Sequence, residues 1–179
     1  MKSRLRSCLL AMSAGALLLA TAPAQAQDKK LEFYAGYAYL HSDDGSLNGL
    51  RFSPAYRLKG ALSLVGDFSA EFGKLADTDT TLTSFLGGLR ARKAFGTTAI
   101  FIHALAGGVR TSSSITPFQG VSISVNDTGI AFDGGGGLDF KLSHFKLRLG
   151  ADYLRREVDI GGGKTANEDN IRATVGFVF

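Results

Sequence analysis

The chain has 179 residues, enough for one domain or two small ones. Its 45% hydrophobic and 20% charged residues exclude a disordered tail, and its 23 glycines follow no collagen-like repeat. The formal net charge of +4 is raised by three basic residues among the first 26; without them, 17 basic residues stand against 16 acidic ones. A nearly neutral chain gives no electrostatic reason to expect nucleic-acid binding.

The first 26 residues are typical of a secretory signal peptide. The segment starts with the basic residues Lys2, Arg4 and Arg6, and an uncharged apolar run follows at residues 9–20. Ala24 and Ala26 place small residues where signal peptidase requires them. The run is shorter than the roughly 20 residues of a membrane-spanning helix, and the residues before Cys8 form no lipoprotein box. We expect cleavage after Ala26 and export of residues 27–179, which contain no cysteine for a disulfide or a thiolate metal site.

The exported part predicts an all-β fold. From Leu31 onward apolar and polar residues alternate with a period of two, and clusters of Gly, Asp, Ser and Thr interrupt the pattern. The predicted strands, each of a length that crosses a bilayer, are Leu31–Leu40, Leu47–Leu58, Ala61–Phe72, Leu82–Lys93, Ala99–Arg110, Thr128–Phe140, Phe145–Arg156 and Asn170–Phe179. Together with their connections, these strands account for residues 27–179 and leave no room for a second domain.

The connections between these strands alternate in length. Those after the second, fourth and sixth strands are tight, around residues 59–60, 95–96 and 142–143. The others are longer and polar, at 41–46, 73–81, 111–127 and 157–169. This describes an up-and-down meander with two unequal ends. In the longest connection, Ile115, Phe118, Val121, Ile123 and Val125 could instead extend the flanking strands as a hairpin.

The two faces of the strands differ in size as well as polarity. One face carries Phe, Leu and Tyr, whereas the other carries Gly, Ser, Asp and Arg, as Phe68 and Ser69 illustrate. The lumen of an eight-stranded barrel holds few bulky groups, so the small polar face belongs inside and the apolar face meets lipid. We expect an eight-stranded antiparallel up-and-down transmembrane β-barrel in contact with lipid.

The chain resembles the small outer-membrane β-barrel proteins of Gram-negative bacteria, of the OmpA/OmpX type, in its leader ending in Ala24-Gln25-Ala26, its eight-strand meander and its terminal residues 175–179. Residues 36–40, 47–49, 67–69 and 103–108 resemble the outer membrane protein β-barrel domain family in particular. The resemblance implies that Val175, Phe177 and Phe179 form a signal read by the outer-membrane assembly machinery, after delivery by periplasmic chaperones. It also implies residence in the bacterial outer membrane, in contact with outer-membrane lipid and with both termini in the periplasm.

Charged residues on the inner face are candidates for a polar network in the lumen. They are Glu32, Arg51, Asp67, Glu71, Arg90, Arg92, Asp133, Asp139, Lys146, Arg148, Asp152 and Arg172, joined by His103. Counting from the turns predicts three pairings: Arg51 with Asp67 or Ser69, Asp139 with Lys146, and Asp152 with Arg172. Unpaired charges in a narrow lumen are costly, so the pairing favours a structural plug, with a gated polar path as the alternative.

His103 is the histidine expected on the barrel wall. No metal-ligating residues stand near it at the usual sequence spacings, and no His-x-Ser motif resembles the outer-membrane enzymes that modify lipid A. We therefore expect a hydrogen-bonded lumen residue, no catalytic residues and no cofactor. The glycines at 134–137 continue into a strand rather than a helix, so they favour relief of crowding over a phosphate site.

These features predict a non-enzymatic protein with a structural, anchoring or surface-interaction role, in which the four long loops contact an unknown extracellular ligand. A narrow gated pore for small polar solutes is the alternative, although an eight-stranded barrel has room only for its own side chains. A lipid-modifying enzyme is a further alternative, but the chain lacks the His-x-Ser motif that such an enzyme would need.

Overall fold

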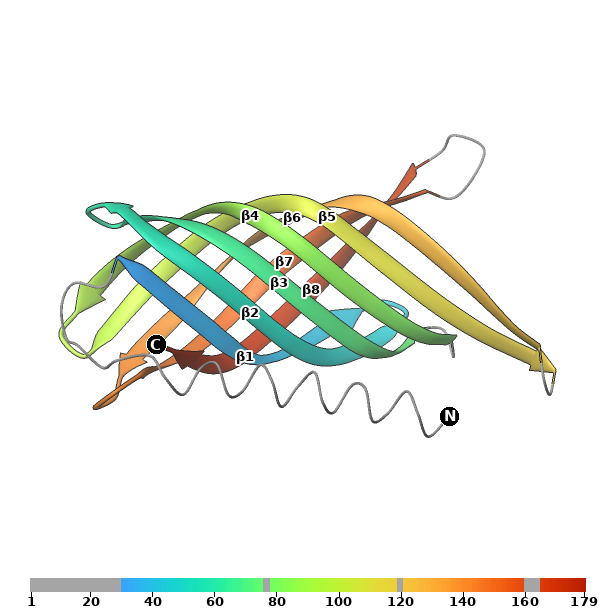
Figure 1. Cartoon of the computed structure of the whole chain (residues 1–179), viewed down its shortest axis with the longest axis horizontal. Helices are drawn as coiled ribbons and strands as arrows, with labels where there is room; N and C mark the ends of the chain where they lie inside the picture. Colours follow the sequence, from blue (N-terminus) through green and yellow to red (C-terminus); the bar gives the residue numbers. More distant parts are fainter. Residues whose placement is uncertain (1–29, 76–77, 119–120, 160–164) are drawn as a thin grey trace.

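Eight antiparallel strands, each hydrogen-bonded to its neighbours in chain order, form a closed barrel (Figure 1). The computed structural model describes residues 30–75, 78–118, 121–159 and 165–179, so the expected leader and its cleavage site at Ala24 and Ala26 lie outside the described residues. The strands are β1 (Leu31–Ser42), β2 (Gly45–Lys59), β3 (Leu62–Leu75), β4 (Thr78–Phe95), β5 (Thr98–Phe118), β6 (Val121–Lys141), β7 (Lys146–Asp159) and β8 (Thr165–Val178). The predicted fold is confirmed.

The barrel closes where the last strand meets the first. The ladder between β1 and β8 runs from Tyr34 paired with Val178 to His41 paired with Ile171. Phe179 extends it, because its amide nitrogen donates to the Phe33 carbonyl oxygen at 2.9 Å and the Phe33 amide donates back at 3.3 Å. Closure therefore uses the described chain up to Phe179 and pairs the edges of β1 and β8 with each other.

One end of the barrel holds the tight turns and both ends of the described chain, and we call it the turn end (Figure 1). Gly60 and Gly96 occupy two of these turns with φ of 58° and 62°, a region that favours glycine. The third turn spans residues 142–145, where the Leu142 amide donates to the Phe145 carbonyl at 2.9 Å. The opposite end, where Ser42, Leu75, Phe118 and Asp159 finish their strands, is the loop end.

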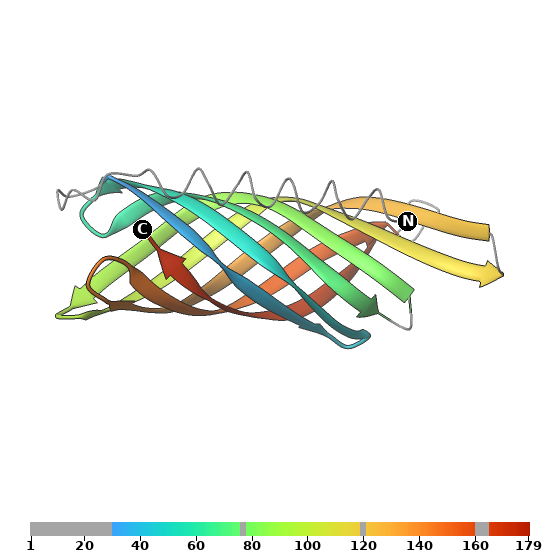
Figure 2. The ribbon, with the colours of Figure 1, turned by 60° about the horizontal axis from the view of Figure 1, so that its bottom comes forward.

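Several strands extend beyond their predicted limits at the loop end. β5 and β6 have 21 residues each, and they remain paired from Thr111 opposite Asp127 to Phe118 opposite Val121. The long connection expected at 111–127 is therefore mostly a hairpin, as the alternative interpretation held. Its backbone projects past the rest of the barrel (Figure 2). The alternation of small polar and β-branched residues through this segment accounts for the continued pairing.

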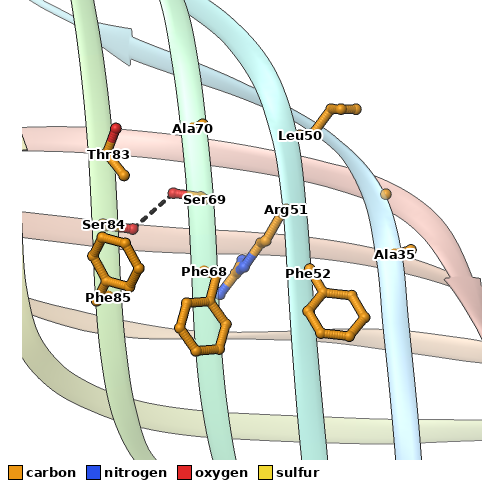
Figure 3. Close-up of a pocket in the computed structure, with 11 residues that line it drawn as sticks. Ala35, Leu50, Arg51, Phe52, Phe68, Ser69, Ala70, Thr83, Ser84 and Phe85 are labelled. Carbon is orange, nitrogen blue, oxygen red and sulfur yellow. Dashed lines mark hydrogen bonds between the residues drawn. The ribbon is translucent and has the colours of Figure 1, made fainter. Parts of the chain in front are cut away.

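The outer face is apolar, as predicted, and the inner face carries most of the buried small and charged residues, although large apolar side chains such as Leu82 and Leu154 also point inward. Phe68 is 43% exposed, whereas the next residue, Ser69, is 4% exposed. Between β1 and β4 the outer face carries a shallow hollow of about 380 Å³, where Ala35, Ala70 and Thr83 leave space beside larger side chains (Figure 3). The Phe68 and Phe85 rings border it edge to face, with their centroids 5.4 Å apart. No helix long and apolar enough to cross a membrane occurs in the described residues.

Candidate functional site

The lumen contains three layers of side chains, and the layer nearest the turn end is basic. Glu32 accepts a hydrogen bond from Arg90 Nη2 at 2.9 Å and another from Lys146 Nζ at 2.6 Å. Asp139 binds Arg92 Nε at 2.9 Å and Arg148 Nε at 2.7 Å. In this layer the cations outnumber the carboxylates.

The pairing predicted for Asp139 is wrong. Asp139 lies opposite Arg148, whereas Lys146 lies opposite Lys141 and reaches Glu32 across the lumen. The prediction placed the turn at residues 142–143, but the turn spans residues 142–145. Moving the centre of a turn by one residue moves the register by two, which keeps each side chain on its face and changes its partner.

Arg148 also contacts the aromatic ring of Phe101 in the basic layer. Its guanidinium carbon lies 4.4 Å from the centroid of Phe101, and the Arg90 guanidinium carbon lies 6.0 Å from the same ring. Phe101 is an inward-facing residue of β5 that the sequence analysis did not assign to the network. The strict alternation around His103 could have identified it, because residues 101, 103 and 105 share one face of a strand.

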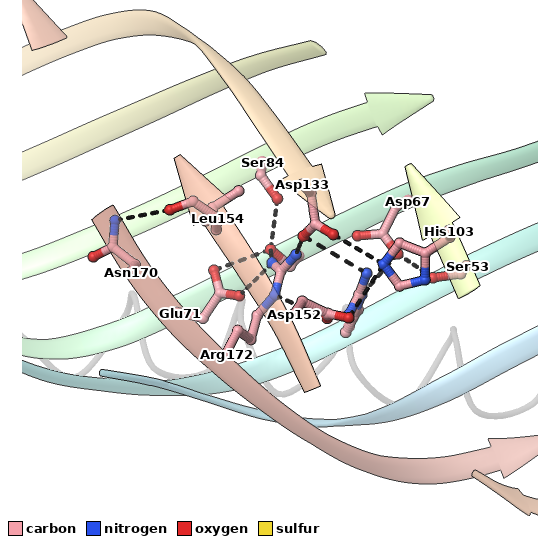
Figure 4. Close-up of polar contacts among 12 residues, drawn as sticks. Ser53, Asp67, Glu71, Ser84, His103, Asp133, Asp152, Leu154, Asn170 and Arg172 are labelled. Carbon is pink, nitrogen blue, oxygen red and sulfur yellow. Dashed lines mark hydrogen bonds and ion pairs between the residues drawn. The ribbon is translucent and has the colours of Figure 1, made fainter. Parts of the chain in front are cut away.

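The central layer is acidic and surrounds two buried arginines (Figure 4). Arg51 Nε lies 2.7 Å from Asp67 Oδ2, and Arg51 also contacts Asp152. Arg172 Nη1 lies 3.2 Å from Glu71 Oε1, and Arg172 also contacts Asp133. The expected proximity of Arg51 to Asp67 is present. So is that of Asp152 to Arg172, which face each other in the β7–β8 register with Arg172 Nε 3.7 Å from Asp152 Oδ2.

His103 joins the central layer through one nitrogen. Its Nε2 lies 2.9 Å from Asp133 Oδ1 and 3.1 Å from Asp152 Oδ1. Gly135 makes this arrangement possible, since it is the β6 residue opposite both His103 on β5 and Asp152 on β7. With no side chain on the middle strand, the imidazole and the Asp152 carboxylate meet across it. The sequence showed no partners for His103 because they come from two other strands.

The third layer closes the loop end with apolar side chains. Leu40, Leu47, Leu82 and Leu154 are fully buried and belong to a cluster that also includes Val109 and Ala131. Above it, Arg156 is buried, donates to Thr111 Oγ1 at 2.7 Å and pairs with Glu168. The sequence analysis did not assign Arg156, Glu168 or these leucines to the lumen site.

A small cavity lies between the basic and central layers. It has a volume of about 20 Å³, and Tyr34, Asp67, Arg90, His103 and Asp152 are among the residues that line it. The Tyr34 hydroxyl, Asp67 Oδ1, Arg90 Nε and Asp152 Oδ1 are buried atoms without a hydrogen-bond partner. A cavity of this size holds about one water molecule, so between these two layers the described side chains fill the lumen around a small polar void.

The model of the outer membrane protein beta-barrel domain family matches residues 12–179. The chain belongs to this family. The outer membrane protein beta-barrel domain therefore accounts for every described strand, and it places the protein in the bacterial outer membrane. No curated protein matches the chain.

Solved structures with this barrel-domain fold are similar in shape but distant in sequence. Neisserial surface protein A (NspA) is 19% identical with a TM-score of 0.61, over 83% of this chain and 94% of that one. Ail, the attachment invasion locus protein of Yersinia pestis, is 18% identical with a TM-score of 0.56, over 83% and 96%. The N-terminal β-barrel domain of Pseudomonas aeruginosa OprF is 15% identical with a TM-score of 0.53, over 86% and 100%. These similarities support the fold.

Proposed function

We propose that this protein is an outer-membrane anchor whose loop end faces the cell exterior and contacts a partner there. The observation that carries the proposal is the β5–β6 hairpin, which extends the wall of the barrel beyond its neighbours (Figure 2). A barrel that only stabilises the membrane needs no such projection. The filled lumen supports the same conclusion, because it makes solute passage the less favoured role.

The hairpin has a backbone edge that can accept another strand. Within the described residues, β6 pairs with β7 only from Ala131, opposite Arg156. Residues 121–128 of β6 therefore have β5 as their only neighbouring strand, although β6 runs from Val121. Unpaired backbone amides and carbonyls along such an edge form a template for strand addition.

The charge of the loop end restricts the chemistry of the partner. Exposed carboxylates there include Asp43, Asp44, Asp79, Glu157 and Asp169, against the exposed cations Lys74, Arg110 and Arg155. An acidic surface attracts a cationic partner and repels a polyanion. Ail has been solved with the heparin analogue sucrose octasulfate, but the acidic loop end here favours a basic protein surface instead of a sulfated glycan.

Shortening the hairpin tests the proposal. Residues 112–126 are replaced by Asn-Gly between Thr111 and Asp127, which are register partners, so that a tight turn closes the ladder. Bacteria displaying the full-length and shortened chains are compared on surfaces coated with a cationic protein or with heparin. We expect the full-length chain to favour the cationic surface and the shortened chain to lose most of that binding.

Two controls make the result specific. Lys93→Gln changes an exposed charge on β4 near the turn end and should leave binding unchanged. Planar-bilayer recording of the refolded full-length chain should show no discrete conductance steps. Equal binding by the shortened chain would refute the role of the hairpin, and sustained channel openings would replace the anchor by the narrow-pore alternative.

A further inference from the structure

We propose that His103, Asp133 and Asp152 bind one divalent transition-metal ion of the zinc type inside the barrel. The proposal is independent of what the loop end contacts. The three side chains come from β5, β6 and β7, and one ligand atom from each lies within 4.8 Å of the others. His103 Nε2 is 2.9 Å from Asp133 Oδ1 and 3.1 Å from Asp152 Oδ1. Ligands about 2.0–2.1 Å from a tetrahedral zinc are separated by about 3.3 Å, so an ion requires the two distances from His103 Nε2 to lengthen by only a few tenths of an ångström.

The free oxygens of both carboxylates point at the same nitrogen. Asp133 uses Oδ2 to bind Arg172, and Asp152 uses Oδ2 to bind Arg51, which leaves the two Oδ1 atoms directed at His103 (Figure 4). The single N–H at Nε2 can make one good hydrogen bond, and it donates to Asp133 Oδ1. Asp152 Oδ1 is left without a hydrogen-bond partner although its side chain is 1% exposed. A cation at the centre of the three atoms satisfies both oxygens at once.

The charge of the central layer supports the same occupant. The contacts of Arg51 and Arg172 connect Asp67, Glu71, Asp133 and Asp152 into one buried group. With His103 neutral, as a metal ligand must be, two arginines face four carboxylates. The neighbouring basic layer carries an excess of two cations, so the lumen as a whole is balanced. A charge in direct contact still stabilises buried carboxylates more than a distant one does. A divalent cation brings the charge of the layer to zero, whereas a proton on His103 removes only half of the excess.

The void beside the site supplies room for a fourth ligand. The cavity of about 20 Å³ is lined by His103, Asp152 and Asp67, and one water molecule fits it. The unpartnered Asp67 Oδ1 is placed to accept a hydrogen bond from such a water, the kind of outer contact that orients metal ligands. One imidazole, two carboxylates and a water suit zinc or cobalt, whereas magnesium and calcium select oxygen ligands alone.

Metal content of the refolded barrel tests the proposal. Residues 27–179, without a polyhistidine tag, are refolded in detergent with zinc sulfate or cobalt chloride present, so that the ion can enter before the lumen closes. After desalting against a weak chelator, metal is measured by mass spectrometry and cobalt by its visible absorption. We expect one zinc per chain and the strong visible bands of tetrahedral cobalt.

The chain contains its own control histidines. His41 and His144 are exposed, and a His41→Gln/His144→Gln double variant should retain one zinc per chain. His103→Gln, which preserves a donor toward Asp133, should bind zinc ~100-fold more weakly, because it removes a ligand itself where outer contacts alone account for 10–100-fold. If His103→Gln does not fold, the double variant still decides, since His103 is then its sole histidine. Absence of stoichiometric metal from the wild type or the double variant, or equal binding by a folded His103→Gln chain, would overturn the proposal.

Discussion

Arg172 provides the sharpest test of the lumen network, because it is fully buried and serves several carboxylates. Its side chain is 0% exposed, lies 3.2 Å from Glu71 and 3.7 Å from Asp152, and also contacts Asp133. Arg172→Met preserves length and removes the charge, which leaves Arg51 as the arginine that balances the central carboxylates. Breaking a buried ion pair by removing one partner costs about 3–5 kcal/mol. At 1.4 kcal/mol per decade, the folded fraction relative to the unfolded one should fall by about two to three and a half orders of magnitude.

The matched control is Arg155→Met on the preceding strand. Arg155 is 49% exposed and its guanidinium lies 3.9 Å from Asp169, so its removal should cost only about 0–1 kcal/mol. Unfolding in urea can be followed by the heat-modifiable gel shift and by circular dichroism, since the chain has no tryptophan. Adding Glu71→Gln to Arg172→Met should recover part of the loss by removing one uncompensated charge. A cost for Arg172→Met no larger than that of Arg155→Met would refute the view that the network stabilises the barrel.

Three further tests address the faces of the barrel, the glycine at the lumen site and the seam between β1 and β8. Phe68→Arg on the lipid face should cost about 2–4 kcal/mol near mid-height and Ser69→Arg less; equal losses in refolding yield would mean that the faces are reversed. Gly135→Ala should lower the stability of the barrel by about 1–3 kcal/mol, because a Cβ there falls 2.7 Å from the Ala151 carbonyl oxygen and against the Asp152 carboxylate. The control Gly134→Ala should be neutral, because a Cβ at that position meets nothing within 4 Å. Deletion of Phe179 removes its backbone pairing with Phe33. We propose that the assembly machinery also recognises this residue, so cell fractionation should find the truncated chain in the periplasm. Normal outer-membrane levels of the truncated chain would argue against that role.

Much of the barrel could be predicted because a period of two assigns each residue to a face without knowledge of its neighbours. Phe68 and Ser69 lie where the alternation places them, and the size rule decided which face is the lumen. The register across a turn was less certain, since it depends on where the turn is centred. The error at Asp139 and Lys146 arose in this way, and the strand ends at the loop end were underestimated because Ser and Thr are compatible with both loops and paired strands.

The site around His103 could not be predicted, because it depends on register across three strands. His103, Gly135 and Asp152 are far apart in the chain and share a row only when both the β5–β6 and β6–β7 ladders are fixed. Sequence spacing reveals ligands on one helix or one turn, not ligands on adjacent strands. Gly135 was read as relief of crowding, which is correct, but the group that needs the space, the Asp152 carboxylate, emerges only from the fold.

The cross-lumen ion pairs have a consequence for how the sheet closes. Glu32 on β1 reaches Lys146 on β7, and Arg51 on β2 reaches Asp152 on β7, so both pairs pass over the seam between β1 and β8. In an open sheet these charges are separated and face lipid or a neighbouring chain without compensation. A half-closed barrel therefore carries two free-energy costs, one from its unpaired backbone edge and one from its unpaired charges. Closure of the seam therefore also brings these buried charges together, and the ion pairs add to the backbone ladder between β1 and β8 in holding the closed barrel against lateral opening.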